Sequence, residues 1–279
     1  HGEDGAERGY LLLARTLEHI GRGDLTAAQE TAAAVTDYGR RFADPNLVAH
    51  GLNAEGRLLT GVGDVATGLR LLDEAMVGVV AGELETISAG TVYCSTIEAC
   101  QWVGDIGRMA QWTHALTRWC ADQPDLVAFT GQAAVHRAQL MRLHGAFQDA
   151  LAELDLAVDR YEAYGGHPAL ALAYRERGDV LRVLGERAEA ENAYVAAADE
   201  GLEVQPHRAL LWLAEHRVDA ALAAVRAVVA STGLPLLRHA IIPGAVEVLL
   251  TAGEVDEAAG LAEELAAIAE SFGCAAVRA

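Results

Sequence analysis

The sequence contains no lysine, because all 21 of its positively charged residues are arginine. This absence excludes a P-loop lysine, a Schiff-base lysine and a lysine general base. Aromatic residues make up only 5% of the chain, whereas 40 residues are acidic and the net charge is −19. The longest basic run is Arg40-Arg41. The chain therefore lacks the basic surface that nucleic-acid binding needs.

Cysteines and catalytic motifs are also scarce. The four cysteines form no CxxC pair, so we expect reduced thiols in the core of a cytoplasmic protein. His136 and His144 lie eight residues apart without a third ligand, and neither a metal nor a cofactor is predicted. No nucleophile elbow, HExxH motif, nucleotide loop, signal peptide or membrane-length apolar run is visible. Because the chain opens at His1 without methionine, we interpret it as a piece of a longer protein.

A repeat of about 40 residues runs through the chain. Its mark is a turn residue, usually glycine, with an apolar residue two positions later. Successive copies are spaced 40, 41, 41, 40, 31 and 37 residues apart. The turn residues are Gly23, Gly63, Gly104, Gly145, Gly185, His216 and Gly253. A fixed period of this size predicts stacked helical hairpins, each packed on its neighbours.

Each repeat predicts two antiparallel helices joined at the turn. Glycine can adopt the left-handed conformation that ends the first helix, and an aspartate after it can cap the second. The second repeat places small or large apolar residues at Gly56, Leu59, Leu72 and Ala75. This pattern resembles the tetratricopeptide repeat, stretched beyond its usual 34 residues. We therefore predict an all-α, right-handed superhelical solenoid of about seven such hairpins, roughly 6–42, 45–81, 83–121, 124–164, 166–202, 205–232 and 234–273.

By analogy with tetratricopeptide folds, the first helix of each hairpin lines a concave groove. On each first helix, the side chains expected to face the groove lie 13, 10, 6 and 3 residues before the turn glycine, and we call these positions the stripe. The stripe carries four arginines in the central repeats. Arginine suits bidentate capture of carboxylate or phosphate. The predicted ligand-binding residues are Asn53, Arg57, Glu98, Gln101, Gln132, Gln139, Arg142, Arg175, Asp179 and Arg182. The alternative interpretation is that these arginines only pair with nearby carboxylates.

A second resemblance rests on several longer strings. They are the run 93–100, Asp105, Trp112-Thr113, Arg118-Trp119-Cys120, the run 123–127, Gly131-Gln132, His136-Arg137, Gln205-Pro206 and the run 209–211. Together they resemble the helical-repeat region of large actinobacterial transcriptional regulators of the LuxR type. In that family a nucleotide-binding module precedes the repeats and a helix-turn-helix domain follows them. The resemblance implies that ATP hydrolysis and DNA binding belong to those flanking domains.

The predicted function is that of a sensory or protein-interaction domain of a bacterial transcriptional regulator. Its expected partner is a peptide, a protein or an anionic small-molecule effector held in the groove. Two alternatives stay open. One is a pure scaffold or oligomerisation module, and the other is an enzyme that uses an acid pair such as Glu98 and Asp179 across the cavity. Neither direct nucleic-acid binding nor membrane insertion is predicted, and a homo-oligomer is possible.

Overall fold

The backbone geometry at the predicted turns shows that the chain folds into helical hairpins. The turn glycines have φ between 72° and 101°, in the left-handed region that ends a helix. Asp24, Asp64 and Asp105 follow three of them and accept a hydrogen bond from the backbone N–H three residues on, at 3.1, 3.3 and 3.0 Å. The predicted helix caps are confirmed. At the irregular sixth copy, His216 takes the left-handed conformation itself, with φ of 62°.

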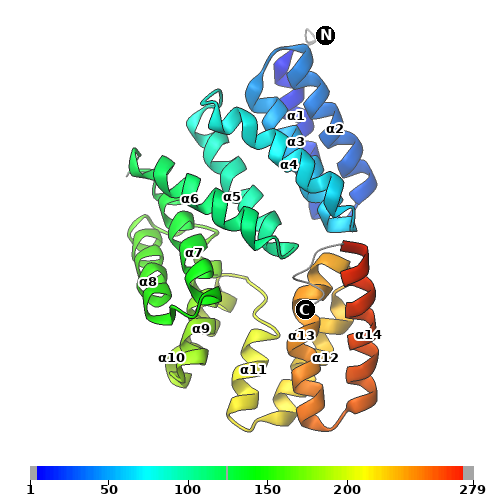
Figure 1. Ribbon diagram of the computed structural model, residues 1–279, viewed down its shortest axis with the longest axis vertical. Coiled ribbons are helices and arrows are strands. Elements are labelled where there is room, and N and C mark those ends of the chain that lie inside the picture. The colour runs from blue at the N-terminus through cyan, green and yellow to red at the C-terminus, as the bar shows by residue number, and fades with distance from the viewer. Residues whose placement is uncertain (1–4, 124, 273–279) are drawn as a thin grey trace. The chain divides into compact units, whose positions relative to one another are not determined.

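The computed structural model describes residues 5–123 and 125–272, and every regular element in these ranges is an α-helix (Figure 1). The predicted all-α class is confirmed. The helices are α1 (Ala6–Gly21), α2 (Leu25–Arg41), α3 (Pro45–Val62), α4 (Val65–Val80), α5 (Thr86–Trp102), α6 (Ile106–Ala121), α7 (Val127–Leu143), α8 (Phe147–Ala163), α9 (Leu170–Leu184), α10 (Arg187–Asp199), α11 (His207–Ala214), α12 (Val218–Ser231), α13 (Pro235–Ala252) and α14 (Val255–Phe272). None of them is long and apolar enough to cross a membrane.

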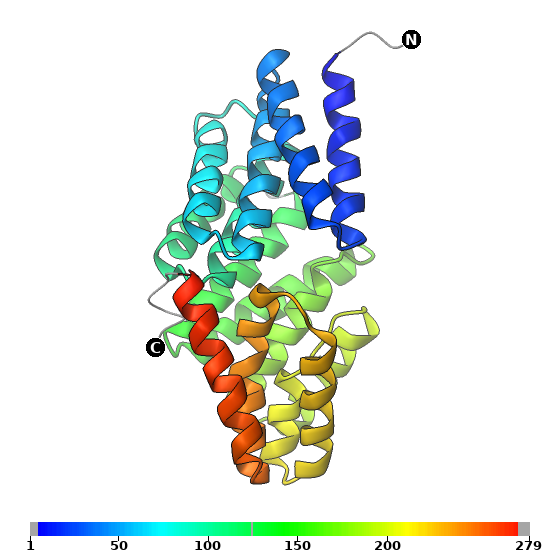
Figure 2. The same cartoon turned by 90° about the vertical axis from the view of Figure 1, so that its right-hand side faces the viewer.

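The described chain divides into two compact units. The first contains α1 to α5, α6 as far as Trp112, and α14 from Ile268 onwards, and the second runs from Thr113 to Ala267. Consecutive helices pack as hairpins within each unit, as Figure 2 shows for the two blue helices α1 and α2. First helices of neighbouring hairpins also touch, since α3 packs on α5 and α7 on α9.

Close packing inside the hairpins depends on the small residues of the repeat. A Cβ atom on Gly68 of α4 would lie 2.6 Å from the carbonyl oxygen of Gly56 on α3, so only glycine permits this backbone approach. Leu72 and Ala75 are each 1% exposed, as the repeat pattern predicts for core positions. In the second unit, Tyr194 of α10 fills the equivalent space against the missing side chain of Gly178.

Candidate functional site

The ten residues predicted to bind a ligand fall into two polar clusters, one in each unit. The first-unit cluster contains Asn53 and Arg57 of α3 with Glu98 and Gln101 of α5. The remaining residues form the second-unit cluster on α7 and α9, namely Gln132, Gln139, Arg142, Arg175, Asp179 and Arg182. Each cluster therefore lies on the first helices of adjacent hairpins.

Asn53 joins α3 to α5 in the first unit. Its amide donates to the Thr96 hydroxyl at 3.2 Å, and its carbonyl oxygen accepts from the Ser95 hydroxyl at 2.8 Å. Asn53 is 7% exposed, and Ser95 and Thr96 are also buried. The sequence predicted an open side chain here. The structure instead uses its hydrogen bonds to hold two helices together, because buried polar atoms need such partners.

Arg57 is held against α5 by a charge and an aromatic ring. Its guanidinium lies 3.5 Å from the Glu98 carboxylate and 4.8 Å from the centre of the Trp102 ring. Burial lowers the pKa of Arg57, and the charge of Glu98 opposes that shift. The Arg57 side chain is still 33% exposed and that of Glu98 is 23% exposed. Gln101 is half-buried on the same helix.

Glu176 of α9 is the centre of the second-unit cluster. Its carboxylate is 3.2 Å from the Arg142 guanidinium and 2.9 Å from that of Arg175. It also accepts a hydrogen bond of 3.1 Å from the Gln139 amide, whose own oxygen lies 3.2 Å from Nδ1 of His136. Burial alone would raise the pKa of Glu176, but the two arginines outweigh it and lower the pKa. Glu176 is therefore an ionised carboxylate that joins α7 to α9.

The side chains of Arg142 and Arg175 are both partly exposed. The Arg142 side chain is 30% exposed and that of Arg175 is 22% exposed, whereas Glu176 is 2% exposed. The Nε atoms of Arg142, Arg175 and Arg182 are buried and donate to no residue within the described ranges. Gln139 is 1% exposed, and its amide holds the Glu176 carboxylate that both arginines share. The cluster presents preordered guanidinium donors beside one carboxylate.

Asp179 forms a second buried centre one turn further along α9. Its Oδ1 accepts from the Tyr194 hydroxyl at 2.8 Å and lies 2.9 Å from Nδ1 of His207. Burial opposes ionisation, but His207, the hydrogen bonds and Arg142 together lower the pKa of Asp179 to about 2. A carboxylate with so low a pKa is a weak proton acceptor at neutral pH. Asp179 is thus suited to holding α9, α10 and α11 together.

The predicted set of ligand-binding residues does not include Glu176 or His207, although Glu176 is the kind of neighbouring carboxylate that the alternative interpretation pairs with Arg175. The stripe rule selects Arg175 and passes over Glu176, which lies nine residues before the turn glycine. A recurring polar residue at that position would have been a usable signal. The residues concerned are Ser95, His136 and Glu176, and all three are buried. His207 carries no comparable mark, since it enters the cluster from a different hairpin.

Trp119 and His144, two further residues named from the sequence, have ordinary structural partners. Trp119 packs edge-on against Phe129 with ring centres 5.9 Å apart, which links α6 to α7. His144 lies 2.7 Å from the Leu140 carbonyl oxygen. Over the described ranges, no group of three or more His, Cys, Asp or Glu side chains is arranged to hold a metal ion. Cys94, Cys100 and Cys120 are buried, and Cys274 lies outside the described residues.

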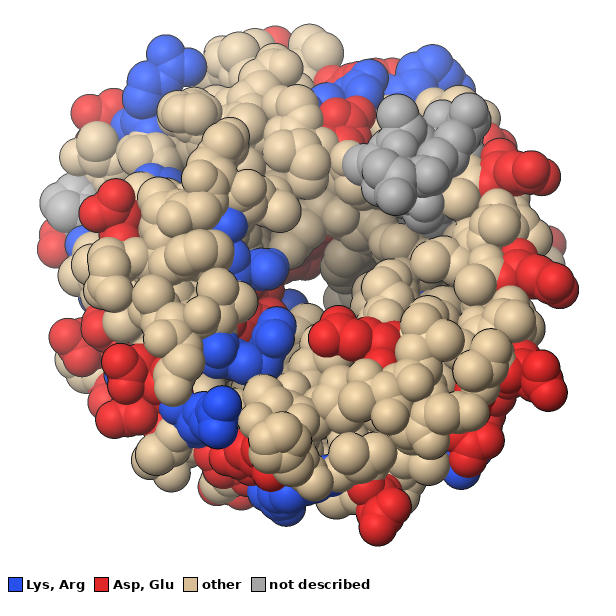
Figure 3. All heavy atoms as spheres, turned by 60° about the horizontal axis from the view of Figure 1, so that its bottom comes forward, with Lys and Arg blue, Asp and Glu red and all other residues tan. Residues whose placement is uncertain are grey.

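Many of the arginines form ion pairs with carboxylates of neighbouring helices or turns. Figure 3 shows acidic side chains spread over one face and arginines gathered on part of it. Representative pairs are Arg137 with Glu153 at 2.6 Å and Arg177 with Asp155 at 2.7 Å. These pairs agree with the alternative interpretation, in which arginines on helices only pair with nearby carboxylates. Arg142 and Arg175 differ from them because both share one fully buried carboxylate.

Known structures have the same fold. A Rap protein complexed with competence and sporulation factor aligns with a TM-score of 0.71 and 12% identity, over 95% of this chain and 76% of that one. A tetratricopeptide repeat protein from Parabacteroides merdae ATCC 43184 aligns with a TM-score of 0.51 and 16% identity, over 96% and 94% of the two chains. No protein-family model and no curated protein matches the sequence. The fold of this chain is a tetratricopeptide-like helical repeat.

Proposed function

We propose that this chain is a protein-interaction domain that holds an acidic segment of a partner protein at the second-unit cluster. The observation that carries the proposal is the sharing of Glu176 between Arg142 and Arg175, which are part-exposed. Their remaining N–H donors are fixed in direction, and guanidinium groups bind carboxylates through paired hydrogen bonds. The solved Rap complex supports the proposal because the same fold there holds a bound factor.

Local charge also favours an anionic ligand. The second-unit cluster contains three arginines and two carboxylates, Glu176 and Asp179, on a chain whose net charge is −19. An acidic ligand is repelled by most of this surface and attracted at the cluster. Electrostatic complementarity of this kind selects partners more than it raises affinity. The partly exposed Arg57 and Glu98 of the first unit then serve as an additional contact surface.

The domain is further proposed to be the sensory arm of a LuxR-type transcriptional regulator. The residue strings that resemble that family support this context. Occupation of the cluster would shift the regulator between inactive and active states by the difference in ligand affinity between them. Reading the coding sequence on both sides of this chain tests the idea. A nucleotide-binding module before it and a helix-turn-helix domain after it are expected, and unrelated neighbours would contradict the assignment.

Binding of a fluorescein-labelled acetyl-hexaglutamate amide, followed by anisotropy, tests the proposed site. Arg142→Gln and Arg175→Gln should each weaken binding about tenfold or more, because a hydrogen bond to a charged group contributes about 1.5–3 kcal/mol. The matched control is Arg177→Gln, since Arg177 lies on the same helix but pairs with Asp155 of α8. Equal affinity for all three variants, or no binding by the unmodified protein, would refute the proposal.

Native mass spectrometry distinguishes a small effector from a protein partner. The purified chain is weighed before and after mild denaturation. A discrete extra mass that leaves on unfolding would identify an anionic small molecule as the occupant of the cluster. A bare chain, combined with hexaglutamate binding, supports a protein segment.

Self-association is a second candidate function, favoured by the exposed face of α1. Tyr10, Leu17 and Ile20 share one face of this helix and are 42%, 63% and 40% exposed. Exposed apolar surface of this kind marks interaction sites. Light scattering after gel filtration should show a dimer or larger species that Leu17→Glu converts to monomer. If the unmodified protein stays monomeric when its concentration is raised 100-fold, this function is rejected.

A further inference from the structure

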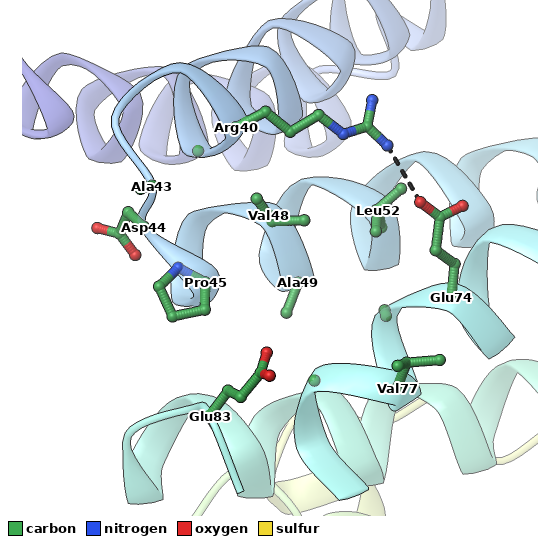
Figure 4. A pocket seen from close by; sticks show the side chains of 13 residues that line it. Arg40, Ala43, Asp44, Pro45, Val48, Ala49, Leu52, Glu74, Val77 and Glu83 are labelled. Atoms are coloured by element: carbon green, nitrogen blue, oxygen red, sulfur yellow. Dashed lines mark hydrogen bonds and ion pairs between the residues drawn. The ribbon is translucent and has the colours of Figure 1, made fainter. Parts of the chain in front are cut away.

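A pocket of about 520 Å³ lies in the first unit, on α2, α3 and α4. It opens between α2 and α4, with α3 as its floor and the segment before α5 at one end (Figure 4). None of the residues of either polar cluster lines it. Its volume is within the range of 300–1,000 Å³ that is typical of ligand sites.

Apolar side chains form the floor and one wall of this pocket. Val48, Ala49 and Leu52 come from α3, and Ala75 and Val77 come from α4. Val77 is 67% exposed, and Val80, one turn further along α4, is 63% exposed. The apolar surface therefore continues past the edge of the pocket. An occupant that covers both valines has to be longer than the pocket itself.

The polar rim of the pocket has an excess of negative charge. Arg40 is its one cation, and its guanidinium is already 3.1 Å from the Glu74 carboxylate at one end of the slot (Figure 4). Asp44 and Glu83 lie at the other end. Asp44 accepts from the Leu47 backbone N–H and the Tyr10 hydroxyl, both neutral donors.

Glu83 is the exposed carboxylate of this end. No cation within the described ranges pairs with it, and its only hydrogen bond is made by its backbone N–H to the Gly78 carbonyl oxygen at 3.1 Å. Two carboxylates thus lie at the same end of an apolar slot, and no cation of the described residues forms an ion pair with either. A Lys or Arg side chain lowers the energy of this arrangement, whereas an acidic one raises it.

We propose that this pocket docks a segment of a partner protein in which an apolar side chain adjoins a Lys or Arg. The apolar side chain lies on Val48, Ala49 and Leu52, and the cationic group lies between Asp44 and Glu83. The flanking apolar residues of the segment cover Val77 and Val80. This pocket shares no residue with the second-unit cluster. It selects a basic segment, whereas the second-unit cluster is proposed to select an acidic one.

The probe is acetyl-Leu-Arg-Leu-amide, and its matched control is the same peptide with neutral citrulline in place of arginine. Titration of a protein with labelled Leu and Val methyl groups is followed by NMR. We expect the methyl signals of Val48, Leu52 and Val77 to shift, with about fivefold tighter binding of the arginine peptide, as two exposed ion pairs would give. In 1 M salt the preference should fall below twofold.

Variants separate the charge from the apolar contact. The double variant Asp44→Asn, Glu83→Gln should bind both peptides within twofold of each other, and its asparagine preserves the helix cap. Val77→Trp fills the slot from an exposed position and should abolish binding of both. Val255→Trp is the control, because Val255 is similarly exposed, at 60%, in the other unit.

Four outcomes would overturn the proposal. The first is equal binding of the arginine and citrulline peptides to the unmodified protein. The second is a set of shifted methyl signals that excludes the pocket. The third is binding of n-hexylammonium as tight as that of the peptide, which would indicate a small organic cation. The fourth is a shift of the same signals with protein concentration alone, which would indicate a second copy of the chain.

Discussion

Asparagine in place of Asp179 removes one buried negative charge while the shape of the side chain hardly changes. The carboxylate is 3% exposed and accepts from the Tyr194 hydroxyl at 2.8 Å. An asparagine carbonyl oxygen can still accept that hydrogen bond. The substitution therefore tests the charge of Asp179, which acts on His207 and Arg142.

The magnitude follows from the pKa of Asp179, which is lowered from 3.8 to about 2. Each pKa unit corresponds to about 1.4 kcal/mol, so the ionised carboxylate stabilises the fold by about 2 kcal/mol. Because the folded-state pKa lies below the unfolded one, this stabilisation is complete above pH 4 or so. It is lost as the pH falls from about 4 through about 2.

Hydrogen exchange of the α9 and α10 amides measures the local free energy of opening in a repeat fold. Asp179→Asn should lower it by about 2 kcal/mol at pH 5.5 and by less than about 1 kcal/mol at pH 2.5. The control is Asp155→Asn, which removes a 49% exposed partner of Arg177 and should cost below about 1 kcal/mol. A loss of equal size at both pH values would show that shape, not charge, is responsible. No loss at pH 5.5 would refute the reasoning.

Three further predictions concern the backbone and the thiols. His216→Gly should stabilise the fold by about 1 kcal/mol in thermal unfolding, because His216 has a left-handed φ of 62°; an unchanged midpoint would contradict this. Gly68→Ala should lower the free energy of unfolding in urea by about 3 kcal/mol, since the new Cβ lies 2.6 Å from a carbonyl oxygen. The control Gly260→Ala has open space around the new Cβ and should leave this free energy unchanged or raise it by up to about 1 kcal/mol. Burial raises the pKa of Cys100 to about 12 and that of Cys120 to about 11, so peptide mapping should show alkylation at pH 8 at least about a hundredfold slower than in urea.

The hairpin fold was predictable because its signals are local. A glycine that ends one helix and an aspartate that caps the next lie side by side in the sequence, and the cap of Asp64 spans only three residues. Its packing was predictable for the same reason, since small residues at fixed distances from the turn mark where two helices meet. The replacement of glycine by His216 weakened the pattern without changing the backbone conformation.

The stripe rule selected the correct helices but not the environment of each side chain. Asn53, Gln139 and Asp179 are 7%, 1% and 2% exposed, although the rule predicts an open surface at all three. Their partners come from neighbouring helices, 15 to 43 residues away in sequence. Spacing within one repeat carries no information about such contacts. That these residues bind a ligand stays a prediction.

A buried carboxylate, Glu176, is what would prepare the second-unit cluster for the proposed anionic ligand. Two free arginines on adjacent helices repel each other and move independently, so a ligand would have to order both. Glu176 already holds Arg142 and Arg175 within 3.2 Å of one carboxylate. A ligand carboxylate that meets their outward N–H groups therefore loses little entropy in ordering the site. The same arrangement limits the affinity for the ligand, because the ligand carboxylate competes with Glu176 for both guanidinium groups. If the proposed function holds, moderate affinity and clear selection for acidic partners are the expected result.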